Sequence, residues 1–505
     1  MQAKDWEKLK SGSDVRGTAL EGVAGEHVDL TDEAVSGIVK AFLYRLAMQS
    51  GKKELTVAVG HDSRLSAGRI ADCVLKAIAA SGANALFTGL SSTPSMFMLL
   101  KEDSLEADAS VMITASHLPF NKNGLKFFTK DGGLEGKDIS EILSLAAEGK
   151  ALSAAAPGSV KNINYIDTYA QGLVRFVREK TGKERPLSGK KIIVDAGNGA
   201  GGFYVDKVLK PLGADTEGSQ FLEPDGRFPN HIPNPENKDA MRSISEQVKK
   251  VKADFGIIFD TDVDRAGAVD SKGEEINRNR LIALISAILL AEKPGVIVTD
   301  SVTSDGLAEF IKKHGGVHRR FKRGYKNVID ESKRLNAEGV YSPLAIETSG
   351  HAALKENYFL DDGAYLVTRI LISLATLANE GKDISELIKD LPEPAEAAEV
   401  RLSFKEGTDF KTLGSGAIED IKKRATEQDG LSLAPDNFEG VRIVFGKDDG
   451  DGWALVRMSL HEPIMPINFE SNKKGGCKQI AKTLLSLLGK YDFLNTENLE
   501  KYLAK

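Results

Sequence analysis

The sequence predicts an α/β protein with several domains, and two observations carry this prediction. Short β-branched runs end in acidic or glycine-rich loops and are followed by helix-like patterns in four segments: "TVAVGHDSRLSAG", "KIIVDAGNGAGG", "FGIIFDTDVDRAG" and "GVIVTDSVTSDGL". This alternation is typical of α/β units on largely parallel sheets. The chain has 505 residues, which is enough for about three to four domains of ordinary size.

Two linker-like stretches divide the chain, "EGKALSAAAPGSV" near 150 and "KDLPEPAEAAEV" near 395. A third boundary near 275 rests on spacing. From about 400 onward, the strand-like "VRIVF" and "GWALVRMSL" precede the helix-like "CKQIAKTLLSLLGKY", a pattern that indicates an α+β domain. The expected domains are 1–155, 156–275, 276–393 and 394–505.

Composition excludes several classes of protein. Hydrophobic residues make up 41% and charged residues 28% of the chain, as in ordinary globular domains, and no stretch is long and apolar enough to suggest a membrane span. The net charge of −6 argues against general nucleic-acid affinity. Cys73 and Cys477 lack metal or disulfide spacing. With the charged N-terminal residues, these features predict a cytoplasmic protein that binds neither membranes nor nucleic acid.

The first loop with chemical potential is "TASHLPFNKNGLKFF" at 114–128. Ser116 lies in a turn-rich loop after an apolar run, beside His117 and ten residues before Lys126 on a predicted strand. A solvated turn serine is one interpretation. The other is a phosphoryl carrier, because such a serine needs exposure and a nearby cation to offset its phosphate, which Lys126 can supply.

The second loop is "DTDVDR", in which Asp260, Asp262 and Asp264 follow the apolar "FGIIF". Three closely spaced carboxylates repel one another unless they converge on a divalent ion, and an oxygen-only ligand set suits Mg²⁺. A calcium-binding EF-hand does not fit, because Arg265 stands where glycine is needed and Ser271 where glutamate is needed. A solvated acidic turn remains the alternative.

Two further loops offer partners for a sugar and for a phosphate. In "ETSGH", Glu347, Ser349 and His351 form a plausible set of hydrogen-bonding partners for sugar hydroxyls, although an ordinary turn is the simpler interpretation of this loop alone. In "RMSLHEP", Arg457 and Ser459 can hold a phosphate, although an arginine after a strand is usually just solvated.

The segment "GNGAGG" at 197–202 matches the glycine fingerprint of dinucleotide-binding loops. The chain contains 49 glycines, so such matches arise readily. The acidic candidates downstream, Glu217 and Glu223, lack a clear position at a strand end. A nicotinamide site is therefore not expected.

Taken together and in this order, the four loops resemble those of the α-D-phosphohexomutase superfamily, which includes phosphoglucomutases, phosphomannomutases and phosphoglucosamine mutases. The resemblance covers most of the chain. Its other landmarks are "SDVRG" at 13–17, "VGHDSRLS" at 59–66, "GLSSTP" at 89–94, "DGRFPNHIPNP" at 225–235, "RGYK" at 323–326 and "LDDGAY" at 360–365. It implies four domains around a central cleft: three related α/β domains with mixed sheets and a smaller C-terminal α+β domain.

The resemblance also implies a mutase that interconverts hexose 1-phosphate and hexose 6-phosphate of glucose or mannose. Ser116 would be the phosphoserine, and one of its phosphate oxygens would complete a Mg²⁺ site with the three aspartates. The general acid or base would come from a set the sequence does not rank: Lys126, His117, Arg16 and His351. Substrate-binding residues would be Arg265, Arg323, Gly324, Lys326, Glu347, Ser349, Arg457, Ser459 and His461.

The implied partners are hexose phosphates and hexose 1,6-bisphosphate, bound by a monomer or small homo-oligomer. The chain departs from the family at Leu460 and His461, where a small or polar residue and threonine are usual. Fewer fixed phosphate donors favour one alternative, a hexose 1,6-bisphosphate synthase on the same scaffold. A catalytically silent relative is the other. Thr348 matches neither residue usual at the variable sugar-loop site, so the preferred hexose stays open.

Overall fold

The computed structural model of the protein describes residues 3–378, 380–459 and 462–505. The chain forms two compact units, each made of two segments. The first comprises Met1–Asn277 and Ser349–Glu386, and the second Arg278–Thr348 and Leu387–Lys505. Within the described residues, no helix has the length and apolar character needed to span a membrane.

The first unit begins with a sheet of order β1-β2-β6-β5-β3-β4-β8, with β7 paired to β6. β3 pairs in parallel with β4 and β5, whereas β6 pairs antiparallel with β2 and β5, so the sheet is mixed as predicted. β8 follows the linker-like stretch near 150 and still joins this sheet beside β4. The strands are β1 (Lys10–Ser11), β2 (Asp14–Thr18), β3 (Thr56–His61), β4 (Asn84–Leu90), β5 (Ala109–Ile113), β6 (Lys122–Thr129), β7 (Gly132–Gly133) and β8 (Val160–Asn162).

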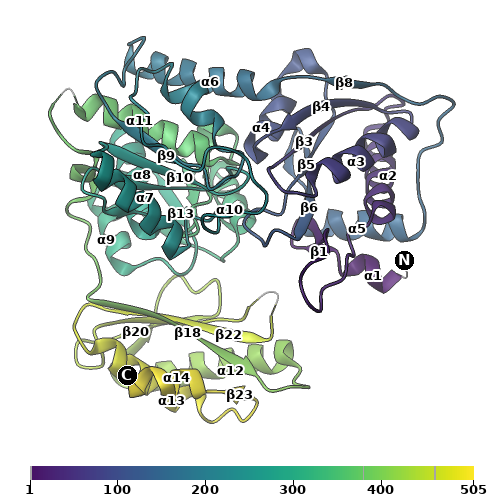
Figure 1. The fold of residues 1–505 in the computed structure, drawn as a ribbon. Helices are drawn as coiled ribbons and strands as arrows, with labels where there is room; N and C mark the ends of the chain where they lie inside the picture. The colour runs from purple at the N-terminus through teal and green to yellow at the C-terminus, as the bar shows by residue number, and fades with distance from the viewer. Residues whose placement is uncertain (1–2, 379, 460–461) are drawn as a thin grey trace. The chain divides into compact units, whose positions relative to one another are not determined.

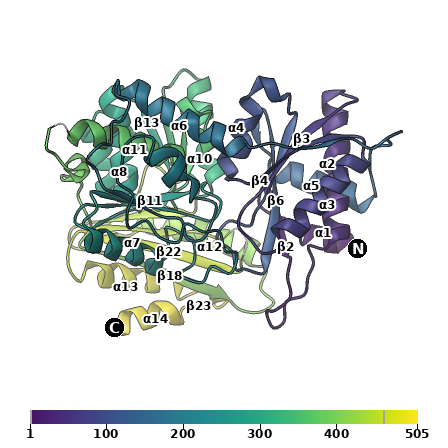
Figure 2. The same cartoon turned by 45° about the horizontal axis from the view of Figure 1, so that its top comes forward.

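Helices α2, α3 and α5 pack together on one face of this sheet, and α4 lies on the other (Figures 1 and 2). The helix α2 begins after Thr31, whose hydroxyl accepts a hydrogen bond from the main-chain nitrogen of Ala34 at 3.2 Å. Its apolar side, including Ile38 and Phe42, is buried in the core. The helical segments are α1 (Ala3–Glu7), α2 (Asp32–Ser50), α3 (Ala67–Ala80), α4 (Thr93–Met98), the 3₁₀ turns Leu99–Lys101 and Asp103–Leu105, and α5 (Gly136–Ala147).

A second mixed sheet of order β12-β11-β10-β9 follows in the first unit. Its strands are β9 (Ile192–Asp195), β10 (Phe255–Phe259), β11 (Ala266–Asp270) and β12 (Glu275–Ile276). The helical segments are α6 (Tyr165–Thr181), the π-helical Val205–Leu209 and α7 (Lys238–Val251). From residue 349 onward the unit adds β16 (Ala352–Leu354), the 3₁₀ turn Lys355–Asn357, β17 (Leu360–Asp361) and α11 (Gly363–Ala378), before a 3₁₀ turn at Ile384–Ile388.

The prediction of a helix after "FGIIFDTDVDRAG" is wrong. β10 turns directly into β11, and the two strands pair antiparallel from Phe259↔Ala266 to Phe255↔Asp270. The main-chain nitrogen of Asp260 donates to the oxygen of Arg265 at 3.3 Å and closes the hairpin. The main-chain groups of "AGAVD" are therefore satisfied by the ladder with β10, a pairing that the local pattern does not reveal.

The second unit contains the parallel strands β14, β13 and β15, with α8, α9 and α10 beside them. "GVIVTDSVTSDGL" forms a strand, a loop and a helix, as predicted. The elements are α8 (Arg278–Glu292), β13 (Val296–Thr299), α9 (Asp305–Lys313), β14 (Val317–Arg320), α10 (Tyr325–Ala337) and β15 (Leu344–Ile346).

The rest of the second unit is an antiparallel sheet of order β19-β20-β21-β22-β18-β23 with helices on one face (Figure 1). It confirms the predicted C-terminal α+β domain. Its last helix carries a buried Leu499, and the ring of Tyr502 lies 5.2 Å from that of Phe469. The elements are β18 (Glu396–Phe404), α12 (Phe410–Glu427), β19 (Leu431–Leu433), β20 (Val441–Phe445), β21 (Gly452–Val456), β22 (Ile464–Ser471), α13 (Gly476–Leu488), β23 (Leu494–Asn495) and α14 (Glu497–Ala504).

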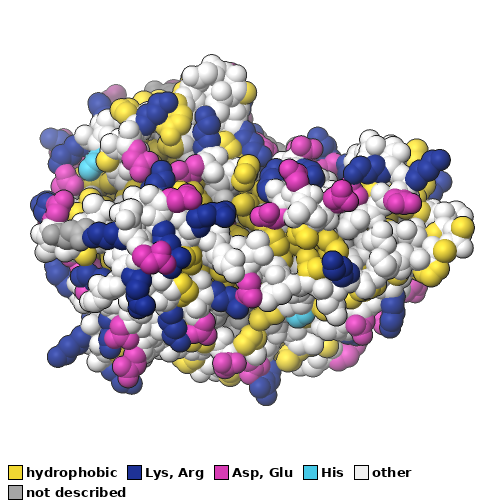
Figure 3. All heavy atoms as spheres, turned by 90° about the horizontal axis from the view of Figure 1, so that it is seen from above, with side chains coloured by type: hydrophobic (Ala, Val, Ile, Leu, Met, Phe, Trp, Pro, Cys, Tyr) yellow, Lys and Arg dark blue, Asp and Glu magenta, His cyan; other side chains and the backbone are white. Residues whose placement is uncertain are grey.

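The surface view in Figure 3 shows basic and acidic side chains interspersed over the face drawn. This mixture agrees with the small net charge of −6. No extended patch of one sign is visible on that face.

Candidate active site

Ser116 lies three residues after the end of β5 in a strained turn. Its φ is +50°, in the left-handed region that is uncommon for residues other than glycine. Its main-chain nitrogen donates to Thr114 Oγ1 at 2.9 Å, and the residue is only 3% exposed. The loop thus holds the hydroxyl in one inward orientation, and the prediction of an exposed serine is wrong for this structure.

Arg64 holds the serine loop in place through hydrogen bonds to its carbonyl groups. Its guanidinium donates to the carbonyls of Ser116 and Leu118, and also to those of Pro119 and Lys122, both at 2.8 Å. Arg64 is 2% exposed, so these four carbonyls take the place of water around its charge. Arg64 is not among the site residues that the sequence predicts, although its motif "VGHDSRLS" is a landmark of the resemblance.

Asp62 connects Arg64 to the same loop. Its Oδ2 accepts from Thr114 Oγ1 at 2.7 Å and lies 3.4 Å from Arg64 Nε. Its Oδ1 accepts from the main-chain nitrogen of Arg64 at 2.9 Å. Burial raises the pKa of Asp62 to about 6 despite this pairing.

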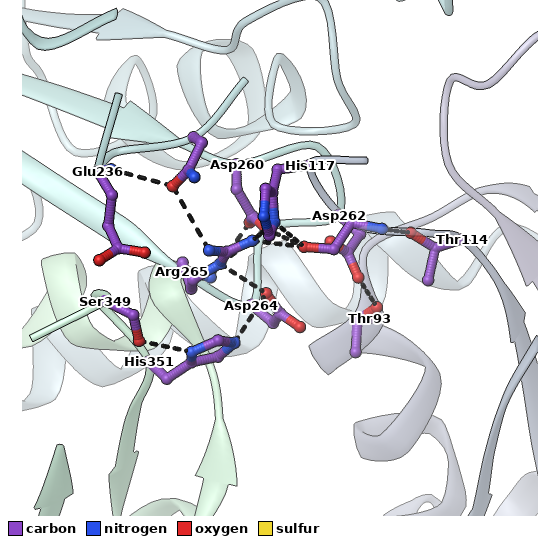
Figure 4. A network of polar contacts seen from close by, with 12 residues as sticks. Thr93, Thr114, His117, Glu236, Asp260, Asp262, Asp264, Arg265, Ser349 and His351 are labelled. Carbon is purple, nitrogen blue, oxygen red and sulfur yellow. Dashed lines mark hydrogen bonds and ion pairs between the residues drawn. The ribbon is translucent and has the colours of Figure 1, made fainter. Parts of the chain in front are cut away.

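The three predicted aspartates come together in the hairpin between β10 and β11. One carboxylate oxygen from each of Asp260, Asp262 and Asp264 lies within 4.8 Å of the others. Val263 between them has a φ of +67°, which is rare for a β-branched residue. This turn lets Asp262 and Asp264 face the same centre, as Figure 4 shows.

A lysine and a threonine contact the aspartates. Lys126 Nζ lies 3.1 Å from Asp262 Oδ2 and 2.5 Å from Asp264 Oδ2. Thr93, from the landmark "GLSSTP", donates through its hydroxyl to Asp262 Oδ2 and through its main-chain nitrogen to the Asp262 carbonyl.

Arg265 connects the aspartates to the serine. Its Nη2 lies 2.5 Å from Ser116 Oγ and 3.1 Å from Asp260 Oδ2, while Ser116 Oγ donates to the same Asp260 oxygen at 2.9 Å. Serine, arginine and carboxylate therefore form one closed cluster. The structure brings together residues that are about 150 positions apart in the sequence.

The electrostatics of the cluster favour added positive charge. Burial, Asp264 and Asp262 together raise the pKa of Asp260 well above its ordinary value. Burial opposes ionisation of Asp264, but Lys126, with His351 and Arg265, lowers its pKa far below the usual range. The three carboxylates repel one another, and a bound divalent cation would remove that repulsion.

The chemistry of the site fits such a cation. Asp262 Oδ1 and Asp264 Oδ1 are buried and have no hydrogen-bond partner among the described residues. Buried carboxylate oxygens without donors are costly, and hard divalent ions prefer oxygen ligands. The three aspartates can therefore hold a metal ion, next to the hydroxyl of Ser116.

His117 and Arg16 lie near the same cluster. His117 Nδ1 contacts Arg265 Nη2 and lies 3.4 Å from Ser116 Oγ. Burial and the charge of Arg265 lower the pKa of His117 to about 3, so its imidazole is neutral near pH 7. Burial disfavours the charge of Arg16, but the carboxylates of Asp14, Asp262 and Asp264 raise its pKa overall.

The predicted sugar loop is divided between the units after Thr348. In the first unit, Ser349 Oγ lies 2.9 Å from His351 Nδ1, and His351 Nε2 lies 3.8 Å from Asp264 Oδ1. Residues Arg265 and His351 also form an antiparallel bridge (Figure 4 shows their side chains). Ser349 and His351 thus lie against the hairpin between β10 and β11 that carries the three aspartates, which we call the metal hairpin.

In the second unit, Glu347 Oε1 accepts a hydrogen bond from the main-chain nitrogen of Gly324 at 2.6 Å. Gly324 has a φ of +112° immediately before α10, a conformation that favours glycine. Thr348 Oγ1 donates to the buried Asp300 at 2.7 Å. Lys326 Nζ lies 3.4 Å from Asp330 Oδ1, one turn along α10.

The predicted phosphate loop follows β21, also in the second unit. Arg457 is 8% exposed, and its Nη1 lies 3.9 Å from Glu439 Oε1. The main-chain nitrogen of Ser459 donates to Ile464 at 3.1 Å, and its Oγ accepts from the nitrogen of Glu462 at 3.2 Å. The predictions for Leu460 and His461 fall outside the described residues.

The glycine segment "GNGAGG" supports the metal hairpin. A Cβ on Gly199 would lie 2.6 Å from the Thr261 carbonyl, and Ala200 N donates to that carbonyl at 2.8 Å. Only a glycine allows the two loops to approach so closely. This packing gives the segment a role in positioning Asp260 and Asp262.

Sequence models of one family match three consecutive parts of the chain. Their descriptions are phosphoglucomutase/phosphomannomutase α/β/α domain I at residues 8–152, domain II at 164–273 and domain III at 277–395. A phosphoglucomutase of Neisseria gonorrhoeae is 30% identical over 464 residues, 91% of this chain and 93% of that protein. A phosphomannomutase/phosphoglucomutase of Pseudomonas syringae is 30% identical over 85% of this chain and 86% of that protein.

A solved structure from Burkholderia thailandensis, titled as a phosphoglucomutase/phosphomannomutase family protein, superposes with a TM-score of 0.78 at 25% identity. It covers 97% of this chain and 99% of that one. Fold and site together define an enzyme of the α-D-phosphohexomutase superfamily. Within it, the chain belongs to the phosphoglucomutase/phosphomannomutase family, whose mutases are isomerases.

Proposed function

We propose that the enzyme interconverts hexose 1-phosphate and hexose 6-phosphate, with glucose or mannose as the hexose, through a phosphorylated Ser116 and a hexose 1,6-bisphosphate. The observation that carries this proposal is the contact of Ser116 Oγ with Asp260 and Arg265, at 2.9 and 2.5 Å, within a cluster that can hold a metal ion. The sugar specificity follows the names of the relatives, which include both phosphoglucomutase and phosphomannomutase.

The first transfer breaks the bond between Ser116 Oγ and phosphorus and forms a bond from phosphorus to the free hydroxyl of the sugar monophosphate. That hydroxyl loses its proton to a base, and the departing Ser116 oxygen takes up a proton; His117, Lys126, Arg16 and His351 stay our candidates for this acid and base. His117 Nδ1 lies 3.4 Å from Ser116 Oγ, but its pKa of about 3 makes the imidazole a weak base near pH 7, so its position alone does not single it out. The second transfer returns the other phosphate of the bisphosphate to Ser116.

We propose Mg²⁺ as the metal, held by Asp260, Asp262 and Asp264 with a phosphoserine oxygen. When bound, it would neutralise phosphate charge and make the phosphorus more electrophilic. Lys126 and Arg265, which contact Asp264 and Asp260, would add positive charge next to the transferring group.

We keep the substrate-binding residues that the family resemblance implies as proposals. Arg457, Ser459 and Arg323 would hold the phosphate that does not react, with Gly324, Lys326 and His461 nearby in the sequence motifs. Glu347 and Ser349 would bind sugar hydroxyls, and Arg265 would contact the reacting phosphate. We further propose a cytoplasmic monomer or small homo-oligomer.

The test is Ser116→Ala. We expect turnover to fall at least roughly 10³-fold, because a lost covalent nucleophile leaves only positioning and electrostatics. Intact-mass measurement should find one phosphate on the wild type after incubation with glucose 1,6-bisphosphate and none on the variant. Near wild-type turnover by pure alanine protein would refute the phosphoserine mechanism.

A further inference from the structure

A carboxylate lies among the residues that we assign to phosphate binding. Glu439 Oε2 accepts hydrogen bonds from the hydroxyl of Ser301 and from the main-chain nitrogen of Arg323, the latter at 3.1 Å. Its Oε1 lies 3.9 Å from Arg457 Nη1. One acid therefore contacts the guanidinium of Arg457 and the main-chain nitrogen of Arg323, groups that a phosphate would also use. We call Arg457, Ser459 and Arg323, which we assign to the phosphate that does not react, the phosphate anchor.

The position of Glu439 is fixed by the backbone beside it. The next residue, Gly440, has a φ of +60°, and a Cβ there would lie 2.1 Å from the Val456 carbonyl and 2.9 Å from Arg457 Cα. The main chain after Glu439 thus packs directly on the strand end that carries Arg457. The side chain of Glu439 is 13% exposed, so solvent screens its charge only partly.

Two more carboxylates act on the same arginines. Asp300 Oδ2 lies 3.9 Å from Arg323 Nε, and Asp300 is buried. Burial lowers the pKa of Arg457, while Glu439, Glu399 and Asp300 oppose that effect. These carboxylates therefore already balance part of the positive charge of Arg457 and Arg323 before any phosphate binds.

We infer that Glu439 is an internal counter-ion that competes with the substrate phosphate for Arg457 and for the Arg323 main-chain nitrogen, and so limits how tightly the anchor holds phosphate. This inference rests on the proposed function. A limited hold suits a bisphosphate that must leave the anchor and rebind in the other orientation. Removing the charge of Glu439 should strengthen phosphate binding and slow release.

The experiment measures glucose 6-phosphate binding by calorimetry in the Ser116→Ala background, which prevents turnover. Glu439→Gln keeps a hydrogen-bond acceptor but no charge, and Glu439→Ala serves as a second neutral variant. Glu419→Gln on the exposed side of α12 is the matched control. Arg457→Gln tests the anchor itself.

We expect both neutral variants to lower the Kd about three- to tenfold, with a smaller effect at high salt because salt screens partly exposed charges. Glu419→Gln should leave the Kd unchanged, and Arg457→Gln should raise it. If Arg457→Gln raises the Kd while both Glu439 variants leave it equal or higher, the inference fails and the proposed function stands. If Arg457→Gln has no effect, the proposed anchor itself is wrong.

Discussion

Arg64 shows how one buried side chain can define a catalytic loop. Its donors satisfy the carbonyls of Ser116, Leu118 and Pro119 in the loop and that of Lys122 at the start of β6. Asp62 offsets its charge at 3.4 Å. The orientation of Ser116 is thus determined by a residue that has no direct role in the proposed chemistry.

We therefore predict that Arg64→Lys lowers kcat by roughly 10- to 100-fold, because a single ammonium cannot replace the planar guanidinium and small misplacements of a nucleophile are costly. Stopped-flow measurement of Ser116 phosphorylation should show the same loss. Arg69→Lys on α3, whose side chain is partly exposed, is the control. A wild-type phosphorylation rate in Arg64→Lys would contradict the positioning role.

The metal proposal is also tested at single residues. Asp262→Asn keeps the shape of one ligand but removes its charge, so we expect Mg²⁺ affinity to fall at least roughly tenfold. Titration of metal-free protein with Mg²⁺ by calorimetry measures this directly. EDTA should abolish turnover, and added Mg²⁺ should restore it. Full activity of rigorously metal-free protein would refute the assignment.

At the scale of elements, the sequence pattern predicts strands better than connections. The apolar runs of β3, β10 and β13 are visible in the sequence, because buried strands need them. The element after β10 is a strand because β11 pairs with it, and pairing partners are not encoded locally. The division into domains at 155, 275 and 393 stays a prediction.

Helix α14 belongs to the core of the C-terminal α+β domain. Leu499 is fully buried in the core of the α+β domain, where α14 packs on α13 and β18. The C-terminal segment therefore packs as a helix against the rest of this domain.

We predict that Leu499→Ala destabilises the C-terminal domain by about 2–5 kcal/mol, through lost apolar contact and a residual cavity. Chemical denaturation followed by fluorescence of Trp453, which lies in the same domain, measures the change. Lys501→Ala, with a side chain 64% exposed, should cost far less. Equal stability of the two variants would show that α14 adds little to this core.

For the whole molecule, the open alternative is release of hexose 1,6-bisphosphate in place of completed isomerisation. It rests on Leu460 and His461 in the phosphate loop. Histidine changes charge near neutral pH, so its hold on phosphate should weaken as pH rises. The alternative therefore predicts more free bisphosphate per turnover at pH 8 than at pH 6.

The measurement is the ratio of free bisphosphate to isomerised monophosphate in a single turnover from phosphorylated enzyme. If the phosphate loop releases the bisphosphate because it depends on His461, we expect His461→Thr to lower this ratio and to remove its pH dependence. A negligible ratio at both pH values, unchanged by the substitution, identifies a plain mutase.

The sequence by itself determined the α/β class, the α+β C-terminal domain and the identity of the chemical groups, because strand periodicity and the motifs around Ser116 and Asp260–Asp264 are local. It did not reveal the inward orientation of Ser116 or the hydrogen bonds from Arg64 to the carbonyls of the serine loop. It also did not reveal the contact of Gly199 with Thr261 or the position of Glu439. Each depends on segments distant in sequence meeting in space. Such contacts form through burial and hydrogen bonding across the whole fold, so only the tertiary structure decided them.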